Sequence, residues 1–208
     1  MTRHVDAVRL LAEADPKLGF WIERVGPCAL PTAPRKHASH FRGLVRAIVA
    51  QQLSSKAAET IFARVETLAE SGGVFSSAKL RALSVSELRA AGLSGMKVSF
   101  VHDLATRIET GALDLRALPA MKDDEAIASL TAVKGIGRWT AQMFLMFELA
   151  RPDIFAVDDL GLKKGMTRLL RSRKPLERER MEKVARSWAP HRSIASWYLW
   201  RIAEAAED

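Results

Sequence analysis

Apolar residues recur along most of the chain at the spacing of an amphipathic helix. Between residues 41 and 49 they occupy positions i, i+3, i+4, i+7 and i+8, which is typical of a helix with one buried face. The same pattern continues over residues 57–69, 98–108, 123–133 and 138–150, and further helices are expected from about Asp159, Glu177 and Arg192. No segment alternates convincingly between apolar and polar residues, although 25–30 is ambiguous, so the pattern predicts an all-α protein.

Short local signals mark where several of these helices begin or end. Ser84 and Glu87 have the spacing of a capping box at a helix start. Glycines at 72–73, 92 and 111 follow apolar stretches and predict helix ends. Residues 27–34 contain prolines and are expected to link a short N-terminal helical piece to the main body.

The chain is basic, and the charge is concentrated in one segment. Of its 208 residues, 32 are Lys or Arg and 24 are Asp or Glu, which gives a formal net charge of +8. Between Lys163 and Arg192 lie eleven basic residues and only three acidic ones, so this segment carries the whole excess. Such an excess favours a polyanionic partner, nucleic acid or an anionic membrane surface, over an ordinary solvated helix face.

Several classes of protein are excluded. Polar residues interrupt every apolar stretch well before the roughly 20 residues that cross a bilayer. Asp6 and Glu13 lie where a signal peptide needs its apolar run, so we expect the protein to be neither secreted nor bound to a membrane. Cys28 is the only cysteine, which excludes an internal disulfide and any zinc or iron–sulfur site built from several thiolates of one chain.

The turn Lys134-Gly-Ile-Gly137, between two predicted helices, is a candidate phosphate site. Two glycines at i and i+2 permit a sharp turn. Amides at the start of the second helix, together with the helix dipole, then suit an anion. A contact made by backbone groups does not depend on base sequence.

The residues around this turn resemble a known family. Val133-Lys-Gly-Ile-Gly-Arg-Trp-Thr-Ala141, followed by Asp153-Ile-Phe-Ala-Val-Asp-Asp159, resembles the helix-hairpin-helix/Gly-Pro-Asp superfamily of DNA glycosylases. Ile48-Val-Ala-Gln-Gln-Leu-Ser-Ser-Lys-Ala-Ala58 resembles the helix and loop with which that family enters the duplex. Trp188-Ala-Pro-His-Arg-Ser-Ile-Ala-Ser-Trp-Tyr-Leu-Trp200 resembles the closing segment of the 3-methyladenine DNA glycosylase II branch. The resemblance covers about residues 38–203.

The resemblance implies a catalytic aspartate near the start of the helix that follows the hairpin, and by position this is Asp159. Breaking an N-glycosidic bond builds positive charge on the sugar. A carboxylate beside C1′ stabilises that charge and orients the attacking water. The ordinary alternative is that Asp158 or Asp159 only caps the helix. We assign catalysis to Asp159 and the capping role to Asp158.

Trp139 lies two positions after the second hairpin glycine, where the bifunctional branches of the superfamily carry a nucleophilic lysine. Without an amine there, no Schiff base can form at that position, so the resemblance implies a monofunctional glycosylase. The four cysteines of the iron–sulfur branches are also absent beyond Cys28, and no iron–sulfur cluster is expected.

The resemblance also implies a substrate pocket, in which an aromatic face stacks on a positively charged alkylpurine. Such stacking adds a cation–π contribution of roughly 0.5–2 kcal/mol. Core packing is the alternative for Trp200 and the expectation for Trp188 and Trp197, because Trp197 and Trp200 are three residues apart. The residues expected to line the pocket are Trp139, Trp200, Met143 and Leu160.

Two segments are expected to contact DNA. The contacts in the first are Gln51, Gln52, Leu53 and Ser54, and those in the second are Lys134, Gly135, Gly137 and Thr140. Gln52, or next Leu53, would fill the space left by a flipped base. The alternative is that Leu53 continues the apolar face of the preceding helix. Ser54 is a candidate cap for the next helix, and residues 92–97 resemble a further turn that contacts the DNA backbone.

No cofactor is expected to be required. In the resembled family, hairpin carbonyls often hold a monovalent cation, here expected to be Na+ or K+ at Thr131, Val133 and Gly135.

The expected fold is all-α, with two helical lobes and a DNA-binding cleft between them. One lobe, 37–154, contains the hairpin at about 123–150, and the other joins 1–36 to 155–208 and carries Asp159 and the basic segment. We expect a compact form of the branch that the sequence resembles, because the 36 residues before the first lobe are too few for an N-terminal β domain.

The expected function is excision of alkylated purines, 3-methyladenine and 7-methylguanine, from double-stranded DNA, by a monomer in the cytoplasm, on nucleoid or nuclear DNA. Two alternatives stay open. One is a glycosylase for hypoxanthine, uracil or an oxidised purine, and the other is a non-catalytic protein that binds DNA structures.

Overall fold

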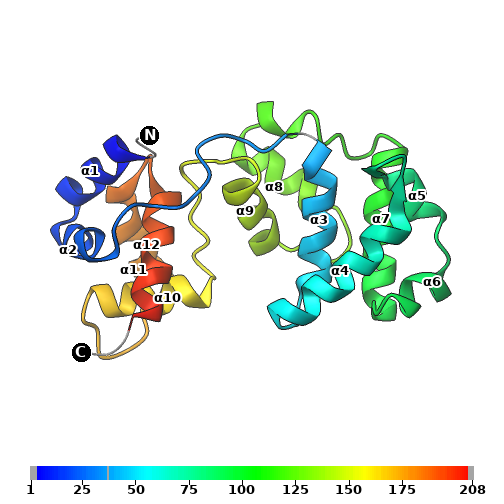
Figure 1. Ribbon diagram of the computed structural model, residues 1–208. Coiled ribbons are helices and arrows are strands. Elements are labelled where there is room, and N and C mark those ends of the chain that lie inside the picture. The colour runs from blue at the N-terminus through cyan, green and yellow to red at the C-terminus, as the bar shows by residue number, and fades with distance from the viewer. Residues whose placement is uncertain (1–3, 37, 206–208) are drawn as a thin grey trace. The chain divides into compact units, whose positions relative to one another are not determined.

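The computed structural model describes residues 4–36 and 38–205. Within this range the chain forms twelve α-helices, two short 3₁₀ helices and one minimal two-stranded hairpin (Figure 1). The all-α prediction is therefore confirmed. None of the described helices is both long and apolar enough to span a bilayer.

The chain divides into two compact units. One combines Met1–Pro34 with Leu145–Asp208, and the other is Arg35–Phe144. The second division falls within a helix, whereas the sequence predicted a boundary after residue 154. Residue 37, where the other predicted boundary lies, is outside the described residues. The cleft between lobes stays a prediction.

The unit Arg35–Phe144 is built around α3, whose residues Leu44, Val45, Ile48 and Val49 are fully buried. The apolar spacing read from residues 41–49 thus marks the buried face of a helix. The helices of this unit are α3 (Ala38–Ala50), α4 (Ser55–Ala69), α5 (Ser77–Ala82), α6 (Val85–Ala90), α7 (Gly95–Glu109), η1 (Leu118–Ala120), α8 (Asp123–Thr131) and the first part of α9 (Arg138–Phe147).

The predicted start of one helix and the predicted ends of two others are confirmed in this unit. Ser84 and Glu87 form the predicted capping box of α6, with both reciprocal hydrogen bonds present. Gly92 and Gly111 have φ of +109° and +74°, so they permit the left-handed backbone that follows many helices.

A short hairpin after α4 was missed by the sequence analysis. Strand β1 (Glu70–Ser71) pairs antiparallel with β2 (Val74–Phe75). Gly72 and Gly73 join them with φ of +58° and +78°, which suits the tight turn that connects two antiparallel strands. Strands of two residues are too short to show alternation, so only the glycine pair was visible as the end of a helix.

The other unit is organised around α12 (Arg192–Glu204), which is buried on most of its sides. Helix α10 packs closely on it, because a Cβ at Gly165 would lie 2.1 Å from the carbonyl oxygen of Leu199. Trp188 is 1% exposed and donates its indole N–H to Asp15 over 3.0 Å, which confirms its predicted place in the core. The helices are α1 (Val5–Ala14), α2 (Pro16–Val25), α10 (Leu160–Leu169), α11 (Arg178–Ala185), η2 (Arg186–Trp188) and α12.

The segment 27–34 forms neither helix nor strand, as a linker would, but it is partly packed. Cys28 and Leu30 are 3% and 4% exposed, and the carbonyl oxygen of Leu30 lies 3.2 Å from the ring Nε2 of His4.

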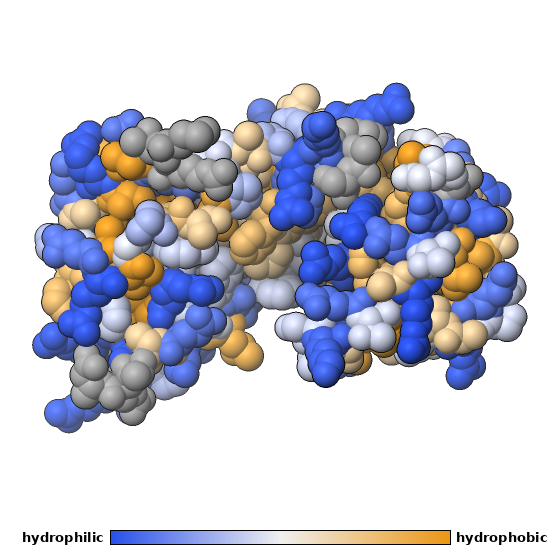
Figure 2. Space-filling view, viewed as in Figure 1, coloured by the Kyte–Doolittle hydropathy of each residue, from blue (hydrophilic) through white to orange (hydrophobic). Residues whose placement is uncertain are grey.

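Across the viewed face of both units, hydrophilic residues dominate and apolar ones appear in smaller groups (Figure 2).

Candidate functional site

Asp159 lies at the N-terminus of α10, in the unit that contains α12. Its Oδ1 accepts a hydrogen bond from the amide of Leu162 over 2.7 Å and another from the indole Nε1 of Trp200 over 2.9 Å. The residue is only 9% exposed. Two donors on one oxygen fix the plane of the carboxylate, and the start of a helix stabilises negative charge.

The capping assignment made from the sequence was wrong. Asp159, not Asp158, is the N-cap of α10. Instead, both carboxylate oxygens of Asp158 accept from one terminal nitrogen of Arg178, Nη1, at 2.8 and 3.0 Å, and the Asp158 side chain is 66% exposed. The two neighbouring acids therefore have different environments, and only Asp159 is held by groups of the interior.

Trp200 has a role that the sequence analysis missed. Besides its hydrogen bond to Asp159, its ring stacks on Phe147 with centroids 5.9 Å apart and planes at 20°. The spacing of Trp197 and Trp200 indicated packing only, whereas the contact with Asp159 joins residues 41 positions apart. Phe147, 37% exposed, was not singled out, although it extends the four-residue spacing of Trp139 and Met143 along α9.

Gly161 makes the contact between Asp159 and Trp200 possible. A Cβ on Gly161 would lie 2.7 Å from Trp200 Cδ1 and 3.0 Å from Asp159 Oδ1. Any larger residue would push the indole or the carboxylate away. The glycine two positions after the aspartate was a signal that the sequence offered.

A second aspartate fixes the segment that leads to Asp159. Asp153 accepts from Nε and a terminal nitrogen of Arg192, both at 2.8 Å, and from the Arg192 amide at 3.2 Å. Burial disfavours ionisation of Asp153, but the hydrogen bonds and charge of Arg192 outweigh it, and the net effect lowers the pKa of Asp153. Arg192 begins α12, so the segment before Asp159 is joined to the helix that carries Trp200.

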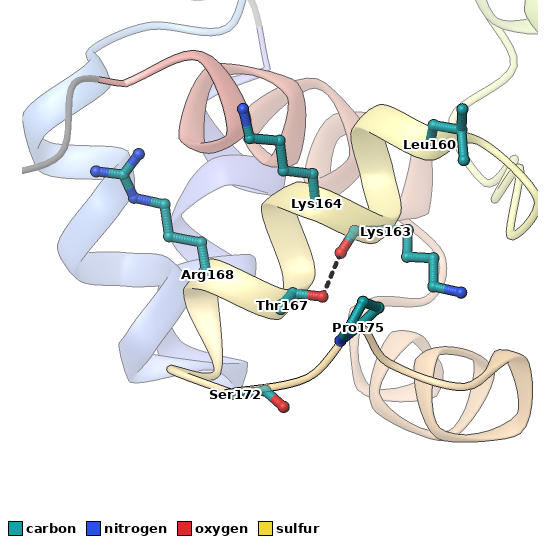
Figure 3. A pocket seen from close by; sticks show the side chains of 7 residues that line it. All are labelled: Leu160, Lys163, Lys164, Thr167, Arg168, Ser172 and Pro175. Carbon is teal, nitrogen blue, oxygen red and sulfur yellow. Dashed lines mark hydrogen bonds between the residues drawn. The ribbon is translucent and has the colours of Figure 1, made fainter.

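A basic groove of about 670 Å³ lies along α10 (Figure 3). It is lined by Leu160, Lys163, Lys164, Thr167, Arg168, Ser172 and Pro175. Leu160, predicted to line the substrate pocket, is 82% exposed and borders this groove. Lys163 and Lys164 extend from α10 in different directions. The groove therefore combines an exposed apolar side chain with the start of the basic segment.

The predicted insertion segment forms a tight turn between α3 and α4, in the unit Arg35–Phe144. Gln52 has φ of +57°, uncommon for a residue with a side chain. Gln52 is exposed and Leu53 is 41% exposed, so the alternative that Leu53 continues the buried face of α3 is wrong. Ser54 accepts from the Ala57 amide at 3.4 Å, which confirms that it caps α4.

Gln51 and Lys97 hold this turn from inside the unit. The side-chain amide of Gln51 donates to the carbonyl oxygen of Gly135 over 2.7 Å, so its predicted contact with DNA competes with an internal bond. The Lys97 ammonium donates to the carbonyl oxygens of Val49 and Gln51 at 2.7 and 2.6 Å. Burial lowers the pKa of Lys97.

The two hairpin glycines serve different purposes. Gly135 has φ of +80°, and a Cβ there would lie 2.1 Å from the ring of Phe100, so both backbone and packing require glycine. A Cβ on Gly137 would meet nothing within 4 Å. The sequence attributed the turn to both glycines, but only Gly135 is needed to form it. Gly137 leaves open space in front of the helix start, where an anion could approach.

The other predicted hairpin contacts differ in exposure. The amide of Lys134 already donates to Asp103 over 2.9 Å, which leaves the exposed side chain as its candidate contact with DNA. Trp139 is 49% exposed, whereas Thr140 is only 9% exposed. The backbone amide at the third position of α9 is therefore the candidate contact of Thr140. Met143 is half-buried.

The predicted cation ligands are partly engaged by the chain itself. The carbonyl oxygen of Val133 accepts from the Ile136 amide at 3.1 Å, and that of Gly135 accepts from Gln51. Among the described residues no group of three or more His, Cys, Asp or Glu could hold a metal. A Na+ or K+ at Thr131, Val133 and Gly135 stays a prediction, in which the carbonyl oxygens of Val133 and Gly135 would use the lone pair that their present hydrogen bonds leave.

Comparisons with known proteins agree on one family. Residues 45–190 match the family described as HhH-GPD superfamily base excision DNA repair protein. DNA-3-methyladenine glycosylase 1 of Schizosaccharomyces pombe is 32% identical over 178 residues, covering 85% of this chain and 78% of that protein.

Two solved structures are similar over nearly the whole chain. The DNA-3-methyladenine glycosidase of Bacillus halodurans has a TM-score of 0.84 and 37% identity, covering 95% of this chain and 88% of that one. The 3-methyladenine DNA glycosylase of S. pombe in complex with abasic DNA has a TM-score of 0.84 and 31% identity, covering 97% and 98%.

Proposed function

Because the chain belongs to the HhH-GPD superfamily of base excision DNA repair proteins, in its 3-methyladenine DNA glycosylase branch, we propose that it excises alkylated purines from double-stranded DNA. Its substrates are 3-methyladenine and 7-methylguanine, and its product is an abasic site. The observation that carries the proposal is the buried Asp159 carboxylate, fixed by Leu162 and Trp200 at a helix start.

Asp159 supplies the negative charge for the reaction. As the C1′–N bond breaks, its electron pair leaves with the base and positive charge develops on the sugar, which the carboxylate stabilises. The oxygen of a water molecule then bonds to C1′, and Asp159 orients this water and accepts its proton. The positive charge of an alkylated purine favours departure of the base.

The enzyme is proposed to be monofunctional. Trp139 occupies the place of the lyase lysine, so no amine is present there to attack C1′. Its half-exposed ring is instead a stacking surface, and a cationic purine over it gains roughly 0.5–2 kcal/mol. Met143 and Trp200 are further candidates for the pocket.

Backbone and basic groups are proposed to hold the DNA. The open space at Gly137 and the helix start behind it suit a phosphate. Gln52 or Leu53 fills the gap left by the flipped base. The excess of Lys and Arg in the segment 163–192 adds affinity that does not depend on sequence. We include in the proposal a monomeric enzyme acting on nucleoid or nuclear DNA.

The test is base release from DNA treated with a methylating agent, with free 3-methyladenine and 7-methylguanine separated by chromatography. Asp159→Asn keeps a side-chain oxygen that accepts from Leu162 and Trp200, and asparagine also caps helices well. The substitution removes only the negative charge. It should lose base release by at least about 100-fold and keep its DNA affinity. Asp158→Asn is the matched control and should release bases at the wild-type rate.

Three results would contradict the proposal or a part of it. Equal release by wild type and Asp159→Asn would remove Asp159 from the reaction. Binding of DNA without release of either methylated base would favour the open alternatives, which a panel of hypoxanthine, uracil and oxidised purines would then separate from non-catalytic binding. Strand cleavage at the abasic product by the wild type would contradict the monofunctional assignment.

A further inference from the structure

One face of α7 contacts both segments proposed to bind DNA. Lys97, Phe100 and Asp103 follow one another at three-residue intervals, so each lies beside the next and all three fall within about a third of the helix circumference. Lys97 donates to the end of α3 and the turn after it, Phe100 packs against Gly135, and Asp103 accepts from the Lys134 amide. These three side chains of α7 thus connect the turn to the hairpin.

Lys97 makes the contacts nearest to the turn. Its ammonium donates to Val49, in the last turn of α3, and to Gln51, in the turn itself. Carbonyl oxygens at the end of a helix lack intrahelical partners and carry partial negative charge, so a cation there is favourable. The side chain is half-buried, so these two bonds determine where the backbone of Gln51 lies.

Gln51 connects Lys97 to the hairpin. Its backbone carbonyl accepts from Lys97, while its side-chain amide donates to the carbonyl of Gly135. One residue is therefore bound to α7 through its backbone and to the hairpin through its side chain. The next residue, Gln52, has φ of +57°, a conformation that persists only where the surroundings impose it.

We propose that Lys97 is a positioning residue, which holds the turn Gln51–Ser54 at a fixed distance from the hairpin Gly135–Gly137. Insertion at one nucleotide then coincides with phosphate binding at the hairpin. The inference rests on the proposed function. A side chain that displaces a stacked base works against a cost of a few kcal/mol, and a small misplacement of a catalytic or binding group already costs much of its effect. The turn must therefore be rigid before DNA arrives.

The experiment compares Lys97→Met, Lys97→Arg and the control Lys79→Met. Methionine keeps the length of the stem and removes the donors, whereas arginine keeps charge and donors. Lys79 is exposed on α5, in the same unit. The probe is a duplex with a tetrahydrofuran abasic analogue and 2-aminopurine beside it. Fluorescence at saturating protein reports unstacking without any base release, so the outcome is separate from the test of the proposed function.

Lys97→Met should reduce the fluorescence rise by at least half, while Lys97→Arg and Lys79→Met match the wild type. The salt dependence of binding should stay unchanged in Lys97→Met, because removal of a direct phosphate contact would lower the slope by about one. Excision from a fully paired duplex should fall about 10- to 100-fold, with a smaller loss when the damaged base is unpaired. A merely structural defect would reduce both excision rates equally.

Three results would overturn the proposal. The first is a full fluorescence rise with Lys97→Met, and the second is no rise with the wild type. The third is a smaller salt dependence of DNA binding in Lys97→Met than in the wild type, which would make Lys97 a phosphate contact. Circular dichroism and thermal unfolding establish that the variants are folded. If Lys97→Met does not fold, Gln51→Leu is used instead, because it removes the hydrogen bond from the Gln51 side chain to the carbonyl oxygen of Gly135. It should give the same loss of fluorescence, and a full rise would contradict the proposal.

Discussion

The region around Asp159 and the region of the turn and hairpin are held in opposite ways. At Asp159 the functional group is a side chain, and its carboxylate is held by the indole of Trp200 and the backbone amide of Leu162. At the turn and hairpin, side chains bond to backbone, since Lys97 and Gln51 donate to carbonyl oxygens and Asp103 accepts from an amide. In the first region the functional group is buried, whereas in the second most of the candidate contacts are exposed and Thr140 is the buried exception.

This difference matches what each region must do. A carboxylate that stabilises charge in a reaction must keep one orientation, away from competing water. A surface that accepts any base sequence works best through backbone groups, so its side chains support the chain from behind. We therefore expect substitutions in the first region to change the rate of base release, and those in the second to change stability or DNA binding.

The strongest test of the second region compares its two glycines. Gly135→Ala introduces a Cβ against Phe100 at a φ of +80°, and should lower the free energy of unfolding by about 2–4 kcal/mol. Gly137→Ala meets nothing, so its melting temperature should stay near that of the wild type while its DNA affinity falls about 10-fold. Thermal unfolding and fluorescence anisotropy measure the two effects. Equal destabilisation by both substitutions would remove the distinction between them.

Trp200→Phe tests the first region with a smaller effect. Phenylalanine keeps a ring for stacking on Phe147 but cannot donate to Asp159, so the single-turnover rate should fall about 10-fold with unchanged DNA affinity. Trp197→Phe is the control, because Trp197 contacts Tyr198 and Arg201 rather than the aspartate. A loss of affinity with an unchanged rate would mean that Trp200 serves binding only.

Asp153→Asn gives the smallest expected effect, and one that depends on pH. Burial alone would raise the pKa of Asp153, but the hydrogen bonds and charge of Arg192 outweigh burial and lower the pKa below its ordinary value of 3.8. The stabilisation is therefore complete above that pH and is lost as the pH falls through the lowered value. At pH 7 the variant should lose about 1–2 kcal/mol of unfolding free energy, and the difference should narrow below pH 4.

Denaturant titrations at pH 7 and pH 3 would measure how far the difference in unfolding free energy between wild type and Asp153→Asn narrows. Asp158→Asn removes an ion pair with the same shortest N···O distance of 2.8 Å, but its partners are 58% and 66% exposed, so it should change stability less than Asp153→Asn does at pH 7. A constant difference between wild type and Asp153→Asn at both pH values would mean that ionisation of Asp153 does not contribute.

Local signals in the sequence predicted local structure well. The capping box at Ser84 and the Ser54 cap both involve groups a few residues apart, so spacing alone identifies them. The error between Asp158 and Asp159 has the opposite cause. Both acids suit a helix start, and the choice between them followed from Arg178 and Trp200, which lie far along the chain.

The sequence by itself determined that the chain is helical, that a glycine hairpin precedes an acidic helix start, and that the excess positive charge lies in one segment. These properties depend on periodicity, composition and short spacings. Only the tertiary structure decided that Trp200 donates to Asp159 and that Lys97 and Gln51 connect the turn to the hairpin. Those contacts join residues 41, 46 and 84 positions apart, and they exist only because apolar faces pack and bring distant helices together.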